Sequence, residues 1–445
     1  MTSTTTEQVS PKTLRRVIVA AGIGNFVEWF DFAVYGFLAT TIAQQFFPSG
    51  DASAALLKTF AVFAVAFAFR PLGGIFFGML GDRIGRKRTL AMTILLMAGA
   101  TTLIGLLPTY AAIGVTAPIL LSLIRCAQGF SAGGEYAGAC AYLMEHAPND
   151  KRAWYGSFIP VSTFSAFAAA AVVAYALEAS LSAEAMGSWG WRLPFLIAAP
   201  LGLVGLYLRW KLDETPAFQA VTEEHAVAHS PFKETLRNHG AAICCLGAFV
   251  SLTALSFYMF TTYFATYLQV AGGLSRATAL LVSLIALLFA AAICPLAGLY
   301  SDRVGRRMTV MTACALLIVA VYPAFLMASS GSFAASVAGV MLLAVGAVLC
   351  GVVTAALLSE TFPTRTRYTA SAITYNMAYT IFGGTAPLVA TWLISTTGSN
   401  LSPAFYLIAI ALLALAGGLA LPETSRISLH DIPVEGKGAG VRAAA

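Results

Sequence analysis

Long apolar runs separated by short polar segments dominate the pattern of this chain. Twelve runs are about 20 residues long or longer, which is enough for a helix to cross a lipid bilayer. They cover residues 17–42, 56–80, 89–107, 115–143, 154–177, 191–209, 241–268, 277–300, 308–328, 333–358, 369–395 and 403–421. Glycine and proline lie within several of them, as membrane helices allow. The pattern predicts an all-α integral membrane protein with twelve transmembrane helices.

The composition agrees with a chain that is surrounded by lipid. Of its 445 residues, 58% are hydrophobic and only 10% are charged, whereas soluble proteins carry about 25% charged residues. The first apolar run begins at Val17, after Lys12, Arg15 and Arg16. It is too long for the core of a signal peptide, so we expect it to be the first membrane helix.

The basic residues are distributed according to membrane topology. If the N-terminus is placed inside, 21 of the 26 lysines and arginines fall on cytoplasmic segments. This bias is typical of membrane proteins, and an even number of spans puts both termini in the cytoplasm. The net charge of +6 therefore does not indicate a nucleic-acid partner. We expect a multi-pass protein of the bacterial inner membrane with both termini cytoplasmic.

The sequence offers no pattern for a metal, a cofactor or a disulfide framework. Its seven cysteines lie in apolar runs and form no C-x-x-C pair, so we interpret them as packing residues. His225 and His229 are four residues apart, but no other histidine or cysteine is near, and a solvated loop is the simpler interpretation. A P-loop for nucleotide-driven transport is missing, and so is a nucleophile and base pair for an enzyme.

Three pairs of segments repeat along the chain in the same order. "GMLGDRIGRKR" at 78–88 returns as "GLYSDRVGRRM" at 298–308, an offset of 220 residues. The shorter echoes pair Glu145, Pro148 and Arg152 with Glu360, Pro363 and Arg367, and "DETP" at 213–216 with "PETS" at 422–425. Such echoes indicate two parallel six-helix repeats, as in transporters whose site lies at the midplane between two moving halves.

The long polar stretch Lys211–Gly240 divides the two repeats. It contains charges of both signs, three histidines and Pro231, which is typical of a linker. We therefore predict an N-terminal six-helix half at 1–210, a cytoplasmic linker at 211–240, a C-terminal six-helix half at 241–422 and a short cytoplasmic tail at 423–445.

The repeated loops resemble the signature G-x-x-x-D-R-x-G-R-[RK] of the major facilitator superfamily. Within it, five segments resemble the metabolite:proton symporter family, which includes α-ketoglutarate permease, citrate symporters and proline/betaine transporters. These segments are "GNFVEWFDFAVYGF", "RPLGGIFFGMLGDRIGRKR", "RCAQGFSAGGEYAGA", "WGWRLPF" and "LDETPAF". The resemblance extends from about residue 15 to residue 425. It implies proton-coupled transport by rocking of the two halves.

Five ionisable residues lie within the predicted spans of the N-terminal half, namely Glu28, Asp31, Arg70, Arg125 and Glu135. A charge at the bilayer centre costs about 2.5–3.5 kcal/mol on insertion scales, so each needs a partner or a water-filled cavity. Glu28 and Asp31 share one face of a helix. Desolvation and like charge raise the proton affinity of such carboxylates. We therefore expect Asp31, Glu28 or Glu135 to carry the coupled proton, although Glu28 and Glu135 are equally consistent with structural ion pairs.

The two buried arginines are the predicted solute ligands. Arginine suits planar recognition of a carboxylate, and Arg125 lies near mid-depth on a helix that should face the cavity, with Gln128 on the same span. Arg70 is included as a second ligand, although it is equally expected to brace the first helix. Glycines from Gly129 onward are expected to allow close packing or backbone access there.

The C-terminal half has no charge in its spans and is expected to supply neutral contacts. Tyr258 and Tyr263 lie in "SFYMFTTYFATYL", and Tyr375 and Asn376 lie in "TYNMAYTIFGG". Aromatic residues at helical spacing often form only the core, and that alternative stays open.

The two repeated loops are expected to act as a gate at the cytoplasmic face. The predicted gating residues are Asp82, Arg83, Gly85 and Arg86 with Asp302, Arg303, Gly305 and Arg306. Charges there can interact with helix ends, and glycine permits tight turns.

These features lead to one main functional hypothesis and two alternatives. The main hypothesis is a monomeric proton symporter that imports a small carboxylate-bearing metabolite, such as a di- or tricarboxylate. The first alternative keeps the mechanism and changes the solute to a zwitterion such as proline or betaine. A proton antiporter that exports drugs is the weaker alternative. The tail at 423–445 shows no heptads, so we do not expect osmotic sensing through a coiled coil.

Overall fold

The computed structural model describes residues 11–84, 86–133, 136, 140, 143–144, 147–210, 231–362, 367–425 and 427. Every regular element among these residues is a helix. Each of the twelve predicted apolar runs contains one. Nine described helices are long and apolar enough to cross a membrane, and a bent pair makes a tenth. The described part of the chain also includes the shorter apolar helix Ala91–Leu106 and the helix Thr116–Ala132.

The elements before residue 211 are α1 (Pro11–Phe37), α2 (Ala39–Phe46), α3 (Ala52–Ala68), α4 (Arg70–Ile84), α5 (Arg86–Leu106), α6 (Tyr110–Ile113), α7 (Thr116–Ala132), α9 (Arg152–Gly156), α10 (Phe158–Ser180), α11 (Ala183–Ser188), η1 (Gly190–Arg192), α12 (Leu193–Leu196) and α13 (Ala198–Trp210). Helix α1 packs against α10 and α13, and α7 packs against α3, α4 and α5. A bend of 63° at Leu38 separates α1 from α2.

The elements after residue 230 are α15 (Pro231–Tyr258), η2 (Met259–Tyr263), α16 (Phe264–Val270), α17 (Arg276–Val304), α18 (Arg306–Ala328), α19 (Phe333–Glu360), α20 (Arg367–Ala378), η3 (Tyr379–Gly383), α21 (Ala386–Thr397) and α22 (Ser402–Leu419). Helix α18 packs between α19 and α22, and α15 packs against α20 and α22. The segments η2 and η3 are π-helical. Contacts of α10 with α17, of α9 with α17 and α19, and of α3 with α21 join the two groups of helices.

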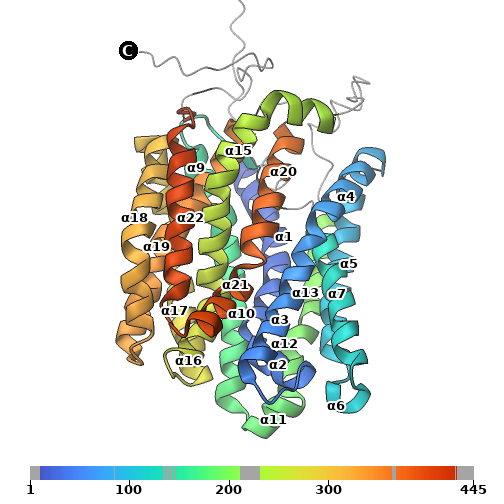
Figure 1. Cartoon of the computed structure of the whole chain (residues 1–445). Coiled ribbons are helices and arrows are strands. Elements are labelled where there is room, and N and C mark those ends of the chain that lie inside the picture. The colour runs from blue at the N-terminus through green and yellow to red at the C-terminus, as the bar shows by residue number, and fades with distance from the viewer. Residues whose placement is uncertain are drawn as a thin grey trace, which may run out of the picture.

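The helices form one bundle with two distinct ends (Figure 1). We call the end with α9, the start of α15 and the end of α22 the terminal end, and the end with α2, α6, α11 and α16 the opposite end. Several helices begin at the opposite end with polar caps, in which the side chains of Asp51, Ser275 and Ser332 accept backbone N–H groups of the first turn. Such caps replace hydrogen bonds that a helix start lacks.

The start of α15 differs from the predicted linker boundary. The predicted linker covers 211–240, and α15 is described from Pro231 onward, where a proline is compatible with the first turn of a helix. The remaining linker residues, 211–230, lie outside the described residues. The division into two halves at this point remains a prediction.

Glycines bring α7 into direct backbone contact with α3 and α4. A Cβ atom on Gly129 would lie 1.6 Å from the carbonyl oxygen of Ala66, and one on Gly73 would lie 1.7 Å from that of Phe130. Small residues at helix interfaces allow this approach in membrane proteins. The contact positions the buried arginines of α4 and α7 near α1.

Candidate solute and proton site

Four ionisable side chains meet in the interior where α1, α4 and α7 come together. Glu28 and Asp31 of α1 are 3% and 1% exposed, and Arg70 at the start of α4 and Arg125 of α7 are fully buried. The structure therefore brings together four of the five predicted intramembrane charges. Glu135 lies outside the described residues.

Arg70 is surrounded by a carboxylate and aromatic rings. Its Nη2 lies 3.5 Å from Oε1 of Glu28 and donates to the carbonyl oxygen of Ala132 at 3.4 Å. Its guanidinium carbon lies 5.4–5.9 Å from the ring centres of Phe67, Phe32 and Trp29. No described residue accepts a hydrogen bond from its Nε or Nη1. Arg70 thus keeps donor capacity inside an aromatic environment.

Arg125 belongs to a polar network within the N-terminal helices. Its Nη1 donates to Oε1 of Gln128 at 2.7 Å, and Nε2 of Gln128 donates to the hydroxyl oxygen of Thr101 at 2.5 Å. The ring centre of Tyr35 lies 4.3 Å from the guanidinium carbon. Gln128, predicted as a solute ligand, therefore orients Arg125.

Asp31 lies beside this network. Thr101 is its polar neighbour and Arg125 is within electrostatic reach, although no direct ion pair forms between Asp31 and a described basic side chain. The hydroxyl of Thr101 donates its only proton to the carbonyl oxygen of Met97 at 3.0 Å. Neither carboxylate oxygen of Asp31 accepts a hydrogen bond from a described residue, so the charged form has little compensation in the interior. This arrangement suits a carboxyl group that takes up a proton.

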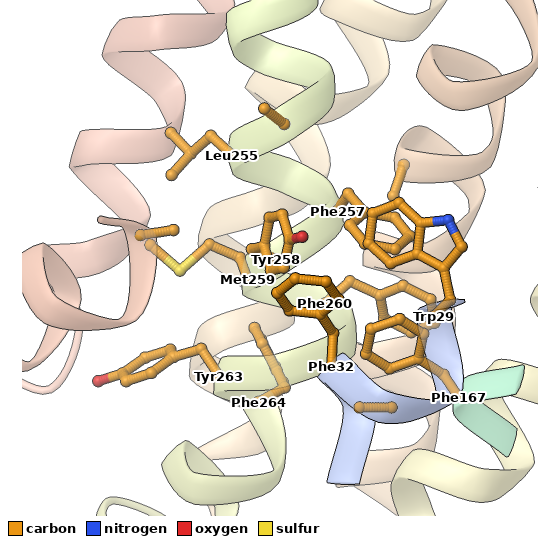
Figure 2. Packing of buried hydrophobic residues seen from close by; sticks show 14 of the residues in the cluster. Trp29, Phe32, Phe167, Leu255, Phe257, Tyr258, Met259, Phe260, Tyr263 and Phe264 are labelled. Carbon is orange, nitrogen blue, oxygen red and sulfur yellow. The ribbon is translucent and has the colours of Figure 1, made fainter. Parts of the chain in front are cut away.

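Tyr258 of α15 packs directly onto the N-terminal aromatic rings. Its ring centre lies 5.1 Å from that of Phe67 and 6.2 Å from that of Trp29. Figure 2 shows Tyr258 facing the same aromatic cluster as Trp29 and Phe32. No described residue hydrogen-bonds to its hydroxyl group, although the side chain is fully buried.

Helix α20 contributes Tyr375 and Asn376 at the same interface. The ring of Tyr375 stacks between those of Tyr136 and Tyr379, with centroid distances of 4.4 and 3.9 Å. Asn376 donates from Nδ2 to the carbonyl oxygen of Gly133 at 3.0 Å. Both predicted residues thus contact the N-terminal half directly.

Tyr263 lies away from this group. It lines a pocket of about 610 Å³ near the opposite end, together with Thr40, Tyr267 and Arg276. Figure 2 shows its ring directed away from Trp29 and Tyr258. The structure therefore does not bring Tyr263 together with the other predicted solute ligands.

The second repeated loop joins the halves at the terminal end through what we call the Asp302 cluster, namely Asp302, Arg306, Glu360 and Arg152. The carboxylate of Asp302 accepts the backbone N–H groups of Ala153 and Trp154 at 3.0 and 2.9 Å. Arg306 lies 2.8 Å from Asp302 and 2.9 Å from Glu360, which also lies 3.3 Å from Arg152. Residues before 211 and after 240 are thereby held together.

The structure also describes two other predicted gating residues, Gly305 and Arg303. Gly305 has a φ of +94°, which lets the chain turn sharply from α17 into α18. Arg303 is exposed and takes no part in the cluster. The side chains of Asp82, Arg83 and Arg86, together with Gly85, lie outside the described residues.

Glu423 of the "PETS" echo caps the start of α18. Its two carboxylate oxygens accept the backbone N–H groups of Arg306 and Arg307 at 2.8 and 3.0 Å. Burial alone would raise the pKa of Glu423, but hydrogen bonds from backbone N–H groups outweigh it and hold this pKa below its usual range. The repeated motif was the only sequence signal for this role.

Removal of the Asp302 charge is expected to open the terminal end. Asp302→Asn keeps the side-chain shape but loses charge-assisted hydrogen bonds to the start of α9, each worth about 1.5–3 kcal/mol. Maleimide labelling of a single cysteine at the buried Ser157, in a variant without other cysteines, should accelerate by roughly ten- to hundredfold. Arg303→Gln is the control and should leave the rate unchanged. Equal rates in Asp302→Asn and the parent would show that the cluster does not hold this end closed.

Comparison with known proteins places this geometry in a family. The sequence model of the Major Facilitator Superfamily matches residues 21–384 and 295–444. The chain belongs to the major facilitator superfamily. The structure is also similar to that of the proton:xylose symporter XylE bound to 6-bromo-6-deoxy-D-glucose, with a TM-score of 0.74, 18% identity and coverage of 95% of this chain and 98% of that one. The partially occluded inward-open xylose transporter XylE from E. coli gives a TM-score of 0.72 at 18% identity, covering 94% and 100% of the two chains.

The chain is also similar in sequence to curated transporters, at a higher identity than to these solved structures. The proline/betaine transporter of Salmonella typhimurium is 40% identical over 422 residues, which are 93% of this chain and 84% of the relative. The ectoine/proline transporter of Corynebacterium glutamicum is 37% identical over 432 residues, 94% and 86% of the two chains. The glycine betaine/proline/ectoine/pipecolic acid transporter of Dickeya dadantii is 39% identical, with coverage of 93% and 84%.

The predicted twelve-helix transporter fold is thereby confirmed. The protein is a multi-pass membrane transporter of this superfamily and not an enzyme. The main hypothesis of a di- or tricarboxylate solute receives no support from these relatives, whose names point to the zwitterion alternative. The prediction and the relatives differ for a chemical reason. A buried arginine indicates that the solute has a carboxylate, but it does not distinguish a di- or tricarboxylate from a zwitterion such as proline, which also carries one.

Proposed function

We propose that the protein is a proton-coupled symporter that imports a small zwitterionic solute of the proline or betaine class. The solute would bind between the two halves, near Arg70 and Tyr258. Asp31 would carry the coupled proton, with Arg125, Gln128 and Thr101 as its surroundings. The terminal end would face the cytoplasm, in agreement with the distribution of basic residues.

The observation that carries this proposal is the environment of Arg70. A zwitterion needs a donor for its carboxylate and a favourable surface for its cationic group. Arg70 has Nε and Nη1 donors without a described partner, and the rings of Trp29, Phe32 and Phe67 surround it. Aromatic faces stabilise quaternary ammonium groups by cation–π attraction, and arginine suits carboxylates. Both chemical requirements are met within one buried cluster.

The charge balance also favours a zwitterion over a di- or tricarboxylate. Among the described residues, two carboxylates, Glu28 and Asp31, and two arginines, Arg70 and Arg125, are buried at this site. A citrate or a 2-oxoglutarate ion would add two or three negative charges to a region in which each acid already has an arginine nearby. A zwitterion adds no net charge and therefore avoids the cost of burying unpaired charge.

Uptake into proteoliposomes tests this function directly. With an inward proton gradient, glycine betaine or proline should accumulate above equilibrium, and a protonophore should stop the accumulation. Citrate and 2-oxoglutarate, offered in parallel, should not accumulate. Accumulation of the carboxylates alone, or accumulation driven undiminished by sodium, would contradict the proposal. Outward movement of protons during uptake would instead indicate an antiporter.

A further inference from the structure

The two buried arginines differ in how many side chains of the C-terminal half lie near them. Arg125 contacts Gln128 on its own helix, and rings from α1 and α3, namely Tyr35, Phe32 and Phe63, lie 4.3–5.3 Å from it. All these contacts belong to helices before residue 211. The electrostatic neighbours of Arg70 include Tyr258, Tyr375 and Tyr379, all of which follow residue 240, whereas among the described residues of that part of the chain Arg125 has Tyr258 alone.

Direct hydrogen bonds between the halves lie next to Arg70. Thr380 donates to the carbonyl oxygen of Phe67 at 2.9 Å, three residues before Arg70 in the chain. Asn376 donates to Gly133 at 3.0 Å, directly after Ala132, whose carbonyl oxygen accepts from Arg70. The guanidinium therefore lies at the seam where α3, α4 and α7 meet α20 and η3.

Both helices that present tyrosines to Arg70 change their geometry at this point. The π-helical segment η2 begins directly after Tyr258, and η3 begins at Tyr379. The two tyrosine rings meet edge to face with 6.1 Å between their centres. A Cβ atom on Gly383 would lie 2.8 Å from Cδ2 of Tyr258, so glycine is needed for this approach. Single π-helical turns are frequent at functional sites.

We propose that Arg70 binds the carboxylate of the solute, that Tyr258, Tyr379 and Trp29 surround its cationic group, and that Arg125 is a positioning residue of the proton site without solute contact. This inference rests on the proposed function and assigns its two arginines separate roles. A solute that moves between the halves must touch both of them in turn. Both arginines keep donors without a described partner, but three tyrosines that follow residue 240 lie near Arg70, whereas Tyr258 is the one described near Arg125. The printed hydrogen bond and ring contacts of Arg125 all stay within helices before residue 211.

The assignment makes Glu28 a competitor for the same guanidinium. Glu28 approaches Arg70 through one nitrogen, Nη2, at 3.5 Å, which leaves Nε and Nη1 for the incoming carboxylate. Arg70 would then interact with two carboxylates, those of Glu28 and the solute, when the solute is bound, and with Glu28 after the solute leaves. This keeps the cation compensated in the empty carrier, so the site does not hold an isolated buried charge.

The experiment compares two ligands that differ only in the recognised group. Glycine betaine carries trimethylammonium and carboxylate groups, whereas choline keeps the trimethylammonium group and has an alcohol. Equilibrium competition binding to purified protein gives the preference for glycine betaine over choline in the wild type, in Arg70→Lys and in Arg125→Lys. Lysine keeps the charge but loses the planar fork of donors, which limits the risk of misfolding.

The expected results differ between the two variants. Arg70→Lys should lower the affinity for glycine betaine by roughly tenfold or more and leave that for choline unchanged, so the preference collapses. Arg125→Lys should keep the preference within about threefold but lose proton-driven accumulation. A preference retained in Arg70→Lys, or lost in Arg125→Lys, would overturn the assignment.

Two further variants decide the question if Arg70→Lys does not fold. Tyr258→Phe keeps the ring but removes a buried hydroxyl group beside Arg70 that has no described partner. That hydroxyl would donate to the solute carboxylate, so its loss should weaken glycine betaine binding several-fold, by about the value of one hydrogen bond. Tyr263→Phe makes the same change away from it and should have no effect. Equal affinities in these two variants would also overturn the assignment. Failure of the wild type to bind either glycine betaine or proline would instead reject the proposed function and, with it, the roles of both arginines.

Discussion

Replacement of Asp31 by asparagine should abolish accumulation of the solute against its gradient. Asparagine keeps the shape of the side chain but cannot exchange a proton. Exchange of labelled for unlabelled solute should continue, because exchange does not require the empty, deprotonated carrier to return. Gradient-driven uptake and counterflow, measured on the same proteoliposomes, separate the two activities.

The control for this variant is Asp51→Asn, which changes another aspartate in the same way. Asp51 is exposed and caps α3 by accepting the N–H of Ser53 at 2.8 Å, and asparagine is an equally good cap. Its accumulation should therefore match that of the wild type. Full accumulation in Asp31→Asn would move the proton site elsewhere, with Glu28 and Glu135 as the next candidates.

Gly129→Ala should prevent correct assembly of the N-terminal helices or strongly destabilise them. The new methyl group would lie 1.6 Å from the carbonyl oxygen and 2.5 Å from the carbonyl carbon of Ala66. These are backbone atoms, so no side-chain rotation relieves the overlap, and the cost should reach or exceed the roughly 1–3 kcal/mol typical of overpacking. The measurement is the fraction of detergent-purified protein that stays monodisperse after heating.

Gly99→Ala on α5 provides the matched comparison. A Cβ atom at Gly99 meets nothing within 4 Å, and alanine is favoured over glycine in a helix by about 1 kcal/mol. This variant should be as heat-resistant as the parent or more so. If both alanine variants survive heating equally, the close contact of α7 with α3 does not determine the stability of the bundle.

The helices of this protein can be predicted from the sequence because lipid demands long apolar segments and leaves few alternatives. The four interior charges can be predicted as well, since Glu28, Asp31, Arg70 and Arg125 interrupt otherwise apolar runs. Their pairing is harder to predict. It depends on the rotation of each helix and on the glycine contacts of α7, which no local pattern reveals.

Neutral members of the site escape sequence analysis for a related reason. Thr101 orients Gln128 and lies beside Asp31, yet a threonine in an apolar helix resembles many others that hydrogen-bond only to their own backbone. The tyrosines show a different failure. Placing Tyr258 and Tyr263 in one site by their helical spacing requires a regular α-helix between them. The segment η2 is π-helical instead, and its wider turn changes the direction of every side chain that follows.

The described tail residues contact helices of both halves. Glu423 holds the first N–H groups of α18, and Thr424 donates to Glu360 at 2.8 Å. The carbonyl oxygen of Ile427 accepts from Arg152 at 2.9 Å. A reporter dye attached to this stretch would therefore sense each turnover of the carrier, and a purification tag placed directly after Leu421 would disturb the same cycle.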